Sequence, residues 1–256
     1  MKLVDVHSHI HLHVFDKDRE VVLSRARDVG VVAIITSTLS YLEIPKALSV
    51  VERYPGFVFL SVGLDPTIFD PLEIQRVVSF IEQFKEKLVA VGEVGLDYAL
   101  VKRSVLREVQ RQNFVRWTKL AEKLDLPLVV HSRRAGKKVV EVLLELGYSR
   151  VVLHAFDGDV GDAQVAEEFG MYFSIPPSVL YSKQKQRLVD KVSIERILLE
   201  SDAPLLGPIR SLRNEPSNIV KVVDKIAEIK NVSVSEVARV TTKNAKELFG
   251  PRLPLS

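Results

Sequence analysis

The sequence predicts an α/β fold of the (β/α)8 TIM-barrel type, with residues 1–256 forming a single barrel domain. Its 256 residues suit one such barrel. Short apolar runs alternate with longer stretches of helical spacing, which is the pattern of parallel strands joined by crossover helices. Polar residues collect where the apolar runs end. An open doubly wound sheet would show the same alternation, but the number of strand candidates for this length fits a closed barrel better.

The apolar runs are short enough to be strands. In chain order they are Lys2–Val6, Val31–Thr36, Phe57–Val62, Leu88–Val91, Leu126–Val130, Arg150–Leu153, Met171–Ser174 and Ile197–Leu199. Amphipathic stretches separate most of these runs and predict helices at Asp18–Val29, Pro71–Lys85, Gln110–Leu124, Lys137–Leu146, Asp159–Phe169 and Ser182–Val192. Two more helices are expected at Ser217–Lys230 and Ser233–Leu248. Ser233 stands three residues before Glu236, which is the spacing of a capping box.

The composition is that of a soluble globular protein and narrows the possible chemistry. Hydrophobic residues make up 46%, charged residues 27%, and the net charge is +3. This small basic excess permits anionic substrates without requiring them. The absence of cysteine excludes disulfides, thiolate metal ligands and a cysteine nucleophile. The sequence shows neither a signal-peptide pattern nor an apolar stretch of the roughly 20 residues that span a membrane, so we expect a cytoplasmic protein without a membrane partner.

Histidines and carboxylates follow several of the predicted strands. The carboxyl ends of all strands in a parallel barrel lie at one face, so these side chains should converge. Imidazole and carboxylate are suitable ligands for Zn²⁺, Mn²⁺, Co²⁺ or Ni²⁺, and carboxylate also favours Mg²⁺. A carboxylate can bridge two ions in a hydrolytic site. The candidate ligands are His7, His9, Glu93, His131, His154 and Asp202.

Four histidines near the start of the chain occupy every second position, at His7, His9, His11 and His13. Side chains two residues apart on a strand share a face and lie about 6.6 Å apart, so spacing alone would allow any neighbouring pair to bind a metal. The apolar run stops at Val6. This position puts His7 and His9 at the strand rim, whereas His11 and His13 are expected in the following loop.

The same period of two predicts which side chains of this strand face the barrel interior. Leu3 and Asp5 would share the interior face with His7 and His9, and the two intervening valines would face the helices. A buried aspartate is costly unless it is paired. We therefore expect Asp5 to orient one of the ligand histidines.

These motifs together resemble the TatD family of metal-dependent deoxyribonucleases and related hydrolases, within the amidohydrolase-like barrel superfamily. VDVHSHIH resembles the D-x-H-x-H opening of the family, and VGEVGLDY resembles its glutamate signature, with QRQNF fitting the element that follows. LPLVVHSR and VLHAFDG resemble the two later histidine motifs, and LLESDAP resembles the aspartate motif. The segment from RNEPSN to KELFG resembles the C-terminal block. The motifs occur in order over nearly the whole chain, which makes the resemblance specific.

The resemblance implies a role for each candidate ligand. One divalent ion would be held by His7, His9 and Asp202, and a second by His131 and His154. Glu93 would bridge the two ions. Two divalent metal ions are expected, and the metal would be Zn, Mg, Mn, Co or Ni. The resemblance also implies hydrolysis of phosphodiester bonds in DNA, as single strands or at 3′ ends, or of a small phosphoester.

The sequence departs from the family pattern at several positions on the expected substrate side. Asp65 stands where the family usually has a histidine, and Arg134 stands where an acidic residue is common. His11 replaces an aspartate that often follows the paired histidines, and Ala155 and Asp157 stand in place of cysteine and serine. None of these changes removes a proposed ligand. We therefore treat Asp65 and His11 as candidate substrate-binding residues.

Arg133 follows His131 by two residues and is a candidate for binding a phosphate oxygen bidentately, although a surface salt bridge is an equal alternative. The expected catalytic residues are Asp202, Glu93 and Arg133. Metal ions bridged by Glu93 would lower the pKa of a bound water. Asp202 would accept a proton from that water, and Arg133 would stabilise the growing negative charge.

Two other functions remain open at this point. An amidohydrolase or lactonase acting on a small carbonyl or phosphoester substrate would use the same metal-activated water. Many such barrels bridge their metals with a modified lysine, whereas the bridging position here is Glu93, which favours the TatD-like nuclease. A non-catalytic barrel would keep the ligands but have no turnover. The sequence carries no signal for an oligomeric state.

Overall fold

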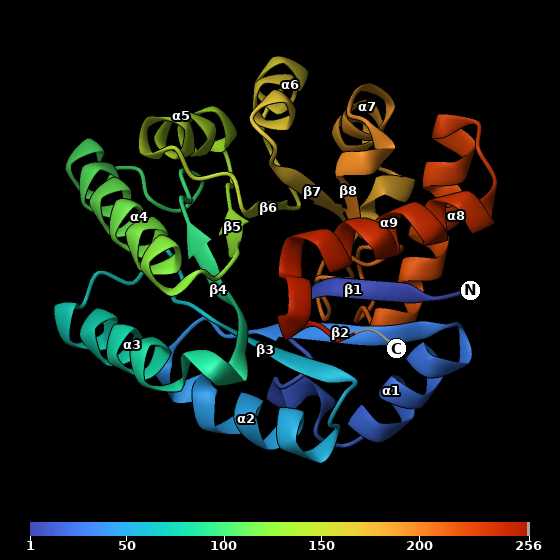
Figure 1. Ribbon diagram of the computed structural model, residues 1–256, viewed down its shortest axis with the longest axis horizontal. Helices are drawn as coiled ribbons and strands as arrows, with labels where there is room; N and C mark the ends of the chain where they lie inside the picture. Colours follow the sequence, from blue (N-terminus) through green and yellow to red (C-terminus); the bar gives the residue numbers. More distant parts are fainter. Residues whose placement is uncertain (255–256) are drawn as a thin grey trace.

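The computed structural model describes residues 1–254, in which eight parallel strands close into a barrel surrounded by helices (Figure 1). Each strand pairs with its neighbour in sequence, and the last pairs with the first. The strands are β1 (Leu3–Ser8), β2 (Val31–Ser37), β3 (Val58–Val62), β4 (Leu88–Gly95), β5 (Leu128–His131), β6 (Val151–His154), β7 (Tyr172–Ile175) and β8 (Ile197–Leu199). The predicted (β/α)8 barrel is confirmed. The predicted single domain includes two residues outside the described range and stays a prediction.

The helices cover the outside of the barrel (Figure 1). They are α1 (Arg19–Asp28), α2 (Ile44–Arg53), α3 (Pro71–Phe84), α4 (Ser104–Leu124), α5 (Gly136–Leu146), α6 (Val160–Glu168), α7 (Lys183–Lys191), α8 (Ile219–Lys230) and α9 (Val234–Phe249). Short 3₁₀ helices occur at His13–Phe15, Tyr41–Glu43, Lys85–Lys87, Pro177–Leu180, Ile194–Arg196, Pro216–Asn218 and Gly250–Arg252.

Two helices differ from the sequence-based expectation. The helix α2 was not predicted, although its buried residues Ile44, Ala47 and Val50 repeat with helical spacing. The helix α4 begins at Ser104 rather than Gln110. The predicted cap of α9 is confirmed, because the side chain of Ser233 accepts a hydrogen bond from the backbone N–H of Glu236 at 3.1 Å.

Side chains from all eight strands fill the barrel interior. They are Val4, Val6, Ala33, Ile35, Phe59, Val89, Ala90, Val129, Val152, Tyr172 and Leu198. The end of α9 and the residues after it close the amino-terminal end of the barrel with Ala245, Leu248, Phe249 and Leu253. In Figure 1, α9 lies across the barrel beside β1. This plug leaves the opposite end, where the strands finish, for the functional side chains.

The interior position of Val4 and Val6 corrects one prediction about β1. Leu3 packs in the apolar layer toward the helices, and Asp5 pairs with Leu199 of that same layer, so neither shares the interior face with His7. The cause is a shift in the pairing of β1 with β2, in which Asp5 pairs with Ile34 but Ser8 pairs with Thr36. One extra residue on β1 is a β-bulge, and it breaks the period of two, so that His7 turns inward directly after Val6.

A second bulge lies on β4 beside Glu93. Val91 pairs with Leu128 and Val94 with Val130, so β4 again carries one extra residue. Gly92 is required at this bulge because a Cβ atom there would come within 2.6 Å of the Val129 Cβ. The two strands that supply His7 and Glu93 are therefore both bulged where those side chains leave the strand. Bulges of this kind re-aim side chains next to active sites.

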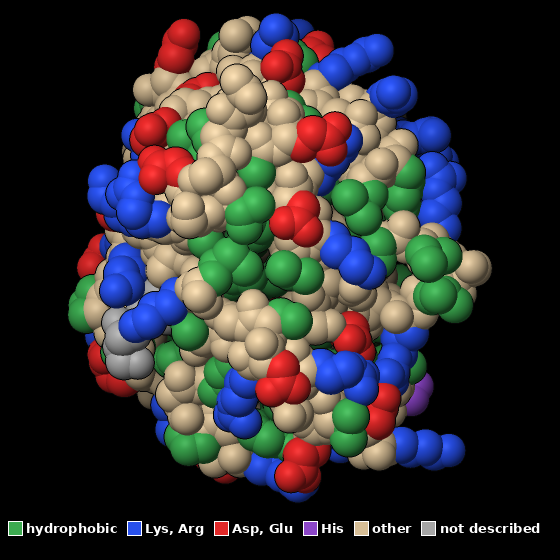
Figure 2. Space-filling view, turned by 90° about the vertical axis from the view of Figure 1, so that its right-hand side faces the viewer, with side chains coloured by type: hydrophobic (Ala, Val, Ile, Leu, Met, Phe, Trp, Pro, Cys, Tyr) green, Lys and Arg blue, Asp and Glu red, His purple; other side chains and the backbone are tan. Residues whose placement is uncertain are grey.

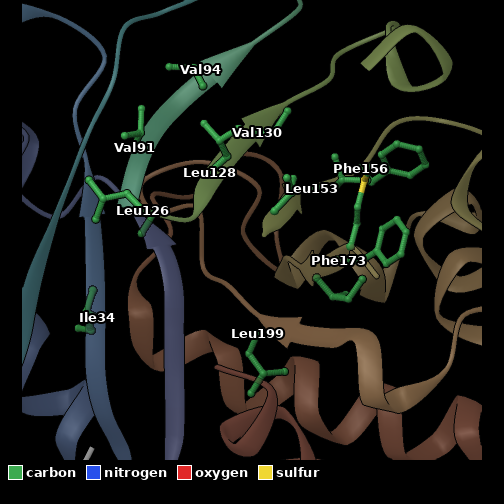
Figure 3. Close-up of a cluster of buried hydrophobic side chains, with 14 of the residues drawn as sticks. Ile34, Val91, Val94, Leu126, Leu128, Val130, Leu153, Phe156, Phe173 and Leu199 are labelled. Atoms are coloured by element: carbon green, nitrogen blue, oxygen red, sulfur yellow. The ribbon is translucent and has the colours of Figure 1, made fainter. Parts of the chain in front are cut away.

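A second apolar layer lies between the strands and the helices, and Figure 3 shows part of it. Labelled residues such as Ile34, Leu128 and Leu153 come from different strands. Phe156 follows β6 and packs edge-to-face on Phe173 of β7, with ring centroids 5.5 Å apart. This packing gives the loop after β6 a rigid base.

The outer surface carries both signs of charge. On the face shown in Figure 2, lysine and arginine side chains are interspersed with acidic ones, and hydrophobic side chains gather near the centre. Surface charge of this mixed kind is typical of a solvated face rather than of a continuous basic groove. In the described part of the chain, no helix combines the length and the apolar character needed to cross a membrane.

Candidate metal centre

The structure brings all six predicted ligands together at the carboxyl ends of the strands. Within β1, His7 is the second-last residue, and His9 follows the strand directly. Glu93 lies in β4, and Asp202 follows β8. The remaining two, His131 and His154, are the last residues of β5 and β6.

Backbone hydrogen bonds fix two of these segments against each other. The N–H of Asp202 donates to the carbonyl of His7 at 2.9 Å, and the N–H of His9 donates to the carbonyl of Ala203 at 2.8 Å. The strand end that carries two imidazoles is thus tied to the loop that carries a carboxylate.

Glu93 stands between two groups of imidazoles. Its Oε2 atom lies 3.1 Å from Nε2 of His7 and 3.6 Å from Nε2 of His9. Its Oε1 atom lies 2.8 Å from Nδ1 of His131 and 3.4 Å from Nε2 of His154. One carboxylate therefore faces both groups with different oxygens, which is what a residue that bridges two ions requires.

Asp202 completes the first of the two groups. Its Oδ1 atom lies 3.5 Å from Nε2 of both His7 and His9. Candidate ligand atoms lie within 4.8 Å of one another in each of three sets of residues: His7, His9 and Glu93; Glu93, His131 and His154; and His7, His154 and Asp202. Each set mixes imidazole with carboxylate, a donor combination suited to a divalent ion.

Each ligand histidine has a second partner on the nitrogen that faces away from the centre. His7 Nδ1 lies 3.1 Å from Ser37 Oγ, and His9 Nδ1 lies 2.7 Å from the Ser37 carbonyl. His131 Nε2 contacts Asp97 Oδ2 at 3.1 Å. Partners of this kind orient the ring and leave its other nitrogen free for a metal.

His154 is held by Glu200, a carboxylate with 0% of its surface exposed. The Nδ1 atom of His154 lies 3.2 Å from Glu200 Oε2, which also accepts a hydrogen bond from the Ser174 hydroxyl. Glu200 Oε1 accepts the backbone N–H of Ala155 at 3.0 Å. Glu200 therefore fixes both the ring of His154 and the start of the next loop.

A buried nitrogen atom without a hydrogen-bond partner in residues 1–254 supports a metal ion at this centre. The Nε2 atom of His7 is buried and has no hydrogen-bond partner among the described residues, although carboxylate oxygens lie near it. A buried polar atom without a partner costs free energy. This nitrogen is well placed to bind an ion shared with the neighbouring carboxylates.

Without an ion, protons would take up part of the negative charge. Burial lowers the pKa of His131, but Asp97 and Glu93 raise it to about 10 overall. Burial likewise lowers the pKa of His154, and Glu200 and Glu93 raise it to about 10. The carboxylates therefore stabilise positive charge at the centre. A divalent ion would provide this charge and displace the imidazole protons.

Sequence reasoning did not single out Asp97 and Glu200 as partners of the ligands. Both lie in motifs that carry ligands, since Asp97 follows Glu93 in VGEVGLDY and Glu200 precedes Asp202 in LLESDAP. The available signal was a carboxylate beside each ligand at a buried strand end, where an unpaired charge would be costly.

Asp5 behaves differently from the prediction that it orients a histidine ring. Its carboxylate accepts hydrogen bonds from the backbone N–H of Ser201 at 2.8 Å and from the Ser201 hydroxyl at 2.6 Å. It meets His7 only at the backbone N–H, at 3.4 Å. Asp5 therefore joins β1 to the segment that leads to Asp202.

The two candidate substrate-binding residues at departures from the family pattern have local partners. His11 is 1% exposed, with Nδ1 2.8 Å from Thr36 Oγ1 and Nε2 3.2 Å from Glu43 Oε2. Asp65 accepts hydrogen bonds from the backbone and the hydroxyl of Thr67. These contacts give no support to substrate binding by His11 or Asp65, which stays a prediction.

Arg133 lies beside the metal centre and is exposed. It lines a cavity of about 540 Å³ together with His131, His154 and Asp202. Its guanidinium forms no ion pair with any residue from 1 to 254 that the structure describes. The surface salt bridge that the sequence also allowed is therefore not formed within this range. Its role in substrate binding and catalysis stays a prediction, now with a suitable position.

Comparisons with known proteins agree with this geometry. The family model described as TatD related DNase matches residues 4–250. The human protein named deoxyribonuclease TATDN3 is 42% identical, over 98% of this chain and 95% of its own length. A Bacillus subtilis protein, the uncharacterized metal-dependent hydrolase YabD, is 32% identical over 96% of this chain and 98% of its own length. The crystal structure of YJJV, a TatD homologue from Escherichia coli, superposes with a TM-score of 0.88 at 27% identity and covers 96% of this chain and 97% of that one.

Proposed function

The chain belongs to the TatD related DNase family, and on this premise we propose that it hydrolyses phosphodiester bonds of DNA with two divalent metal ions. The single observation that carries the proposal is the position of Glu93, whose two oxygens face separate groups of ligands. Enzymes of this type hydrolyse ester bonds, and related proteins carry the names deoxyribonuclease and metal-dependent hydrolase.

The ligands divide naturally between two ions. His7, His9 and Asp202 would hold one, His131 and His154 would hold the other, and Glu93 would be shared. Divalent ions in such a site lower the pKa of a bound water and polarise the phosphate that it attacks. The ions would be drawn from Zn, Mg, Mn, Co and Ni, all of which accept this donor set.

Asp202 is the proposed proton acceptor. Burial raises the pKa of this carboxyl, but the neighbouring imidazoles of His7, His9 and His154 hold it well below the usual range. Asp202 is therefore ionised at neutral pH and can take a proton from the attacking water. Its place against the imidazoles of His7 and His9 fixes the carboxylate at the proposed metal centre.

Arg133 is the proposed phosphate clamp. The guanidinium is free of acidic partners among residues 1–254 and opens onto the cavity beside His131. An arginine in this position can donate two parallel hydrogen bonds to the non-bridging oxygens of a phosphate. The negative charge that develops at phosphorus would be stabilised by this contact.

Several finer features follow from the family resemblance and are proposed on that basis. The substrate would be single-stranded DNA or a 3′ end, with a small phosphoester as the alternative. Independently of the resemblance, we also propose that the protein acts in the cytoplasm. An amidohydrolase or lactonase activity is not favoured, since the shared ligand is Glu93 rather than a modified lysine and the named relatives include deoxyribonucleases.

The proposal is tested by metal analysis of the purified protein together with cleavage of end-labelled single-stranded DNA, with and without a chelator. We expect cleavage that the chelator abolishes and that added divalent ions restore. Glu93→Ala should lose both metal and turnover, whereas Glu228→Ala, an exposed glutamate on α8, should retain both. Cleavage that survives chelation, or full activity and metal content in Glu93→Ala, would refute the proposal. Turnover of lactones or amides but not of DNA or RNA would favour the amidohydrolase alternative.

A further inference from the structure

The cavity beside the metal centre is lined by two cationic side chains besides the proposed phosphate clamp, Arg133. Besides the ligands, it is lined by Arg133, Lys185 and Arg210. None of these three cations forms an ion pair with a residue in the described part of the chain. Asp157 also faces the cavity, and its carboxylate accepts the backbone N–H of Arg134 at 2.9 Å. The three cations are thus available to an anionic ligand.

Lys185 is the unusual member of this group because it is only 7% exposed. It lies on the first turn of α7, and its ammonium donates to the carbonyls of Ala155 at 2.7 Å and Phe156 at 2.5 Å. An ammonium has three donors, so one remains for another acceptor. A buried charge that is held only by neutral carbonyls is costly unless an anion joins it.

The surroundings of Lys185 support an anion as the missing partner. Burial lowers the pKa of Lys185 to about 8, and the acidic groups Asp157, Glu200 and Asp202 offset only part of that effect. Asp157 and Glu200 already accept hydrogen bonds from backbone N–H groups of the adjoining loops, and Glu200 also contacts His154 at the end of β6. A phosphate in the cavity would supply a negative charge that pairs with the Lys185 ammonium.

Arg210 approaches the same cavity from the loop between β8 and α8. Its guanidinium stacks over the ring of Tyr181, 4.6 Å from the centroid, and both residues line the cavity. This stacking holds the guanidinium at the wall while leaving its N–H donors free. Lys185 from α7 and Arg210 from the facing loop therefore present donors to one space.

We propose that Lys185 and Arg210 bind a second, non-scissile phosphate of the substrate strand, next to the phosphodiester held at the metal centre. This inference rests on the proposed function. It makes the preferred substrate an oligonucleotide with at least two phosphates and separates it from simple phosphodiesters. The two cations select the substrate without touching the phosphorus that reacts.

The test compares a thymidine trinucleotide with its analogues in which one of the two linkages is an uncharged methylphosphonate. Each analogue can be cleaved only at its remaining phosphodiester. Both isomers are used so that the neutral linkage lies on either side of the bond that is cleaved. For the all-phosphate trimer, Lys185→Met should raise KM by about 10- to 100-fold with kcat nearly unchanged, because one charge-assisted contact is lost. In an isomer that carries the neutral methylphosphonate at the proposed second-phosphate site, the same substitution should leave KM unchanged.

Lys183→Met is the matched control, because Lys183 is an exposed lysine two residues earlier on α7. Lys183→Met should leave KM unchanged for both the all-phosphate trimer and its neutral analogues. Arg210→Ala repeats the comparison at an exposed position, so the proposal stays testable if Lys185→Met fails to fold. An equal rise in KM for charged and neutral trimers, or no rise for either variant that folds, would overturn the proposal.

A binding measurement separates this inference from the proposed function. Calorimetry with thymidine 3′,5′-bisphosphate on the metal-loaded protein requires no cleavage. We expect binding to the wild type that weakens at least tenfold in Lys185→Met or Arg210→Ala, with metal content unchanged. A wild type that cleaves no DNA but shows this loss would refute the nuclease proposal and support the phosphate site. Equal binding by wild type and variants would refute the phosphate site alone.

Discussion

Replacing Glu200 with glutamine should weaken metal binding although Glu200 is not itself a proposed ligand. Its two carboxylate oxygens serve three groups, namely the His154 ring, the Ser174 hydroxyl and the backbone N–H of Ala155. Glutamine keeps one oxygen and turns the other into a donor. In either orientation of the amide, a donor therefore meets another donor, and at least one hydrogen bond to a fully buried carboxylate is lost.

The magnitude follows from that count. A hydrogen bond to a charged group contributes about 1.5–3 kcal/mol, so the free energy of unfolding of the metal-free protein should fall by about this amount. Loss of a carboxylate that orients a ligand histidine lowers metal affinity by about 10- to 100-fold. Both effects arise at His154, since its ring loses the charge that fixes its orientation and its basicity.

The assay is a competition between the protein and a chromogenic chelator for a divalent ion, combined with urea unfolding of the metal-free protein. Glu228→Gln is the control, because this exposed glutamate pairs only with Lys225 on the same helix among its described contacts. A Glu200→Gln variant that is folded and binds metal within twofold of the wild type would show that Glu200 does not position His154.

Three further predictions concern the substrate clamp, the charges of the centre and the support beneath it. Arg133→Ala should raise KM and lower kcat by about tenfold or more at unchanged metal content, and a parallel loss of metal would contradict the clamp. In the metal-free protein, the pKa of His131 and His154 is raised from 6.5 to about 10, so their stabilisation is complete below 6.5 and is lost as pH rises toward 10. Urea unfolding should show this fall, and a constant or rising stability over that range would disprove it. Phe156→Ala should lower the free energy of unfolding by about 3–5 kcal/mol because Phe156 is fully buried against Phe173, and a loss under about 1 kcal/mol would show that the loop repacks.

The barrel could be predicted because its signals are local. Each strand is a short apolar run and most helices show an amphipathic period, so their order along the chain determines a parallel fold. The exception shows the limit of such signals. The helix α2 was missed although Ile44, Ala47 and Val50 have the right spacing, because ten residues give a short amphipathic pattern.

The ligands could be predicted for a related reason. Strand ends of a parallel barrel meet at one face, so a histidine or carboxylate at the end of a run identifies a candidate without knowledge of its neighbours. The outer partners could not be predicted in this way. Glu200 meets His154, and Lys185 meets Ala155, only after strands and helices pack.

The sequence by itself determined the order of strands and helices and the residue types that gather at the strand ends. The tertiary structure decided which way those side chains point and what they touch. The period of two places His7 with Leu3 and Asp5, but an extra residue in β1 reverses that alternation, and a second bulge in β4 lies beside Glu93. The physical reason is that a bulge is defined by pairing with another strand, and a hydrogen-bond partner by packing with a distant segment, and neither relation is written in the local pattern of one chain segment.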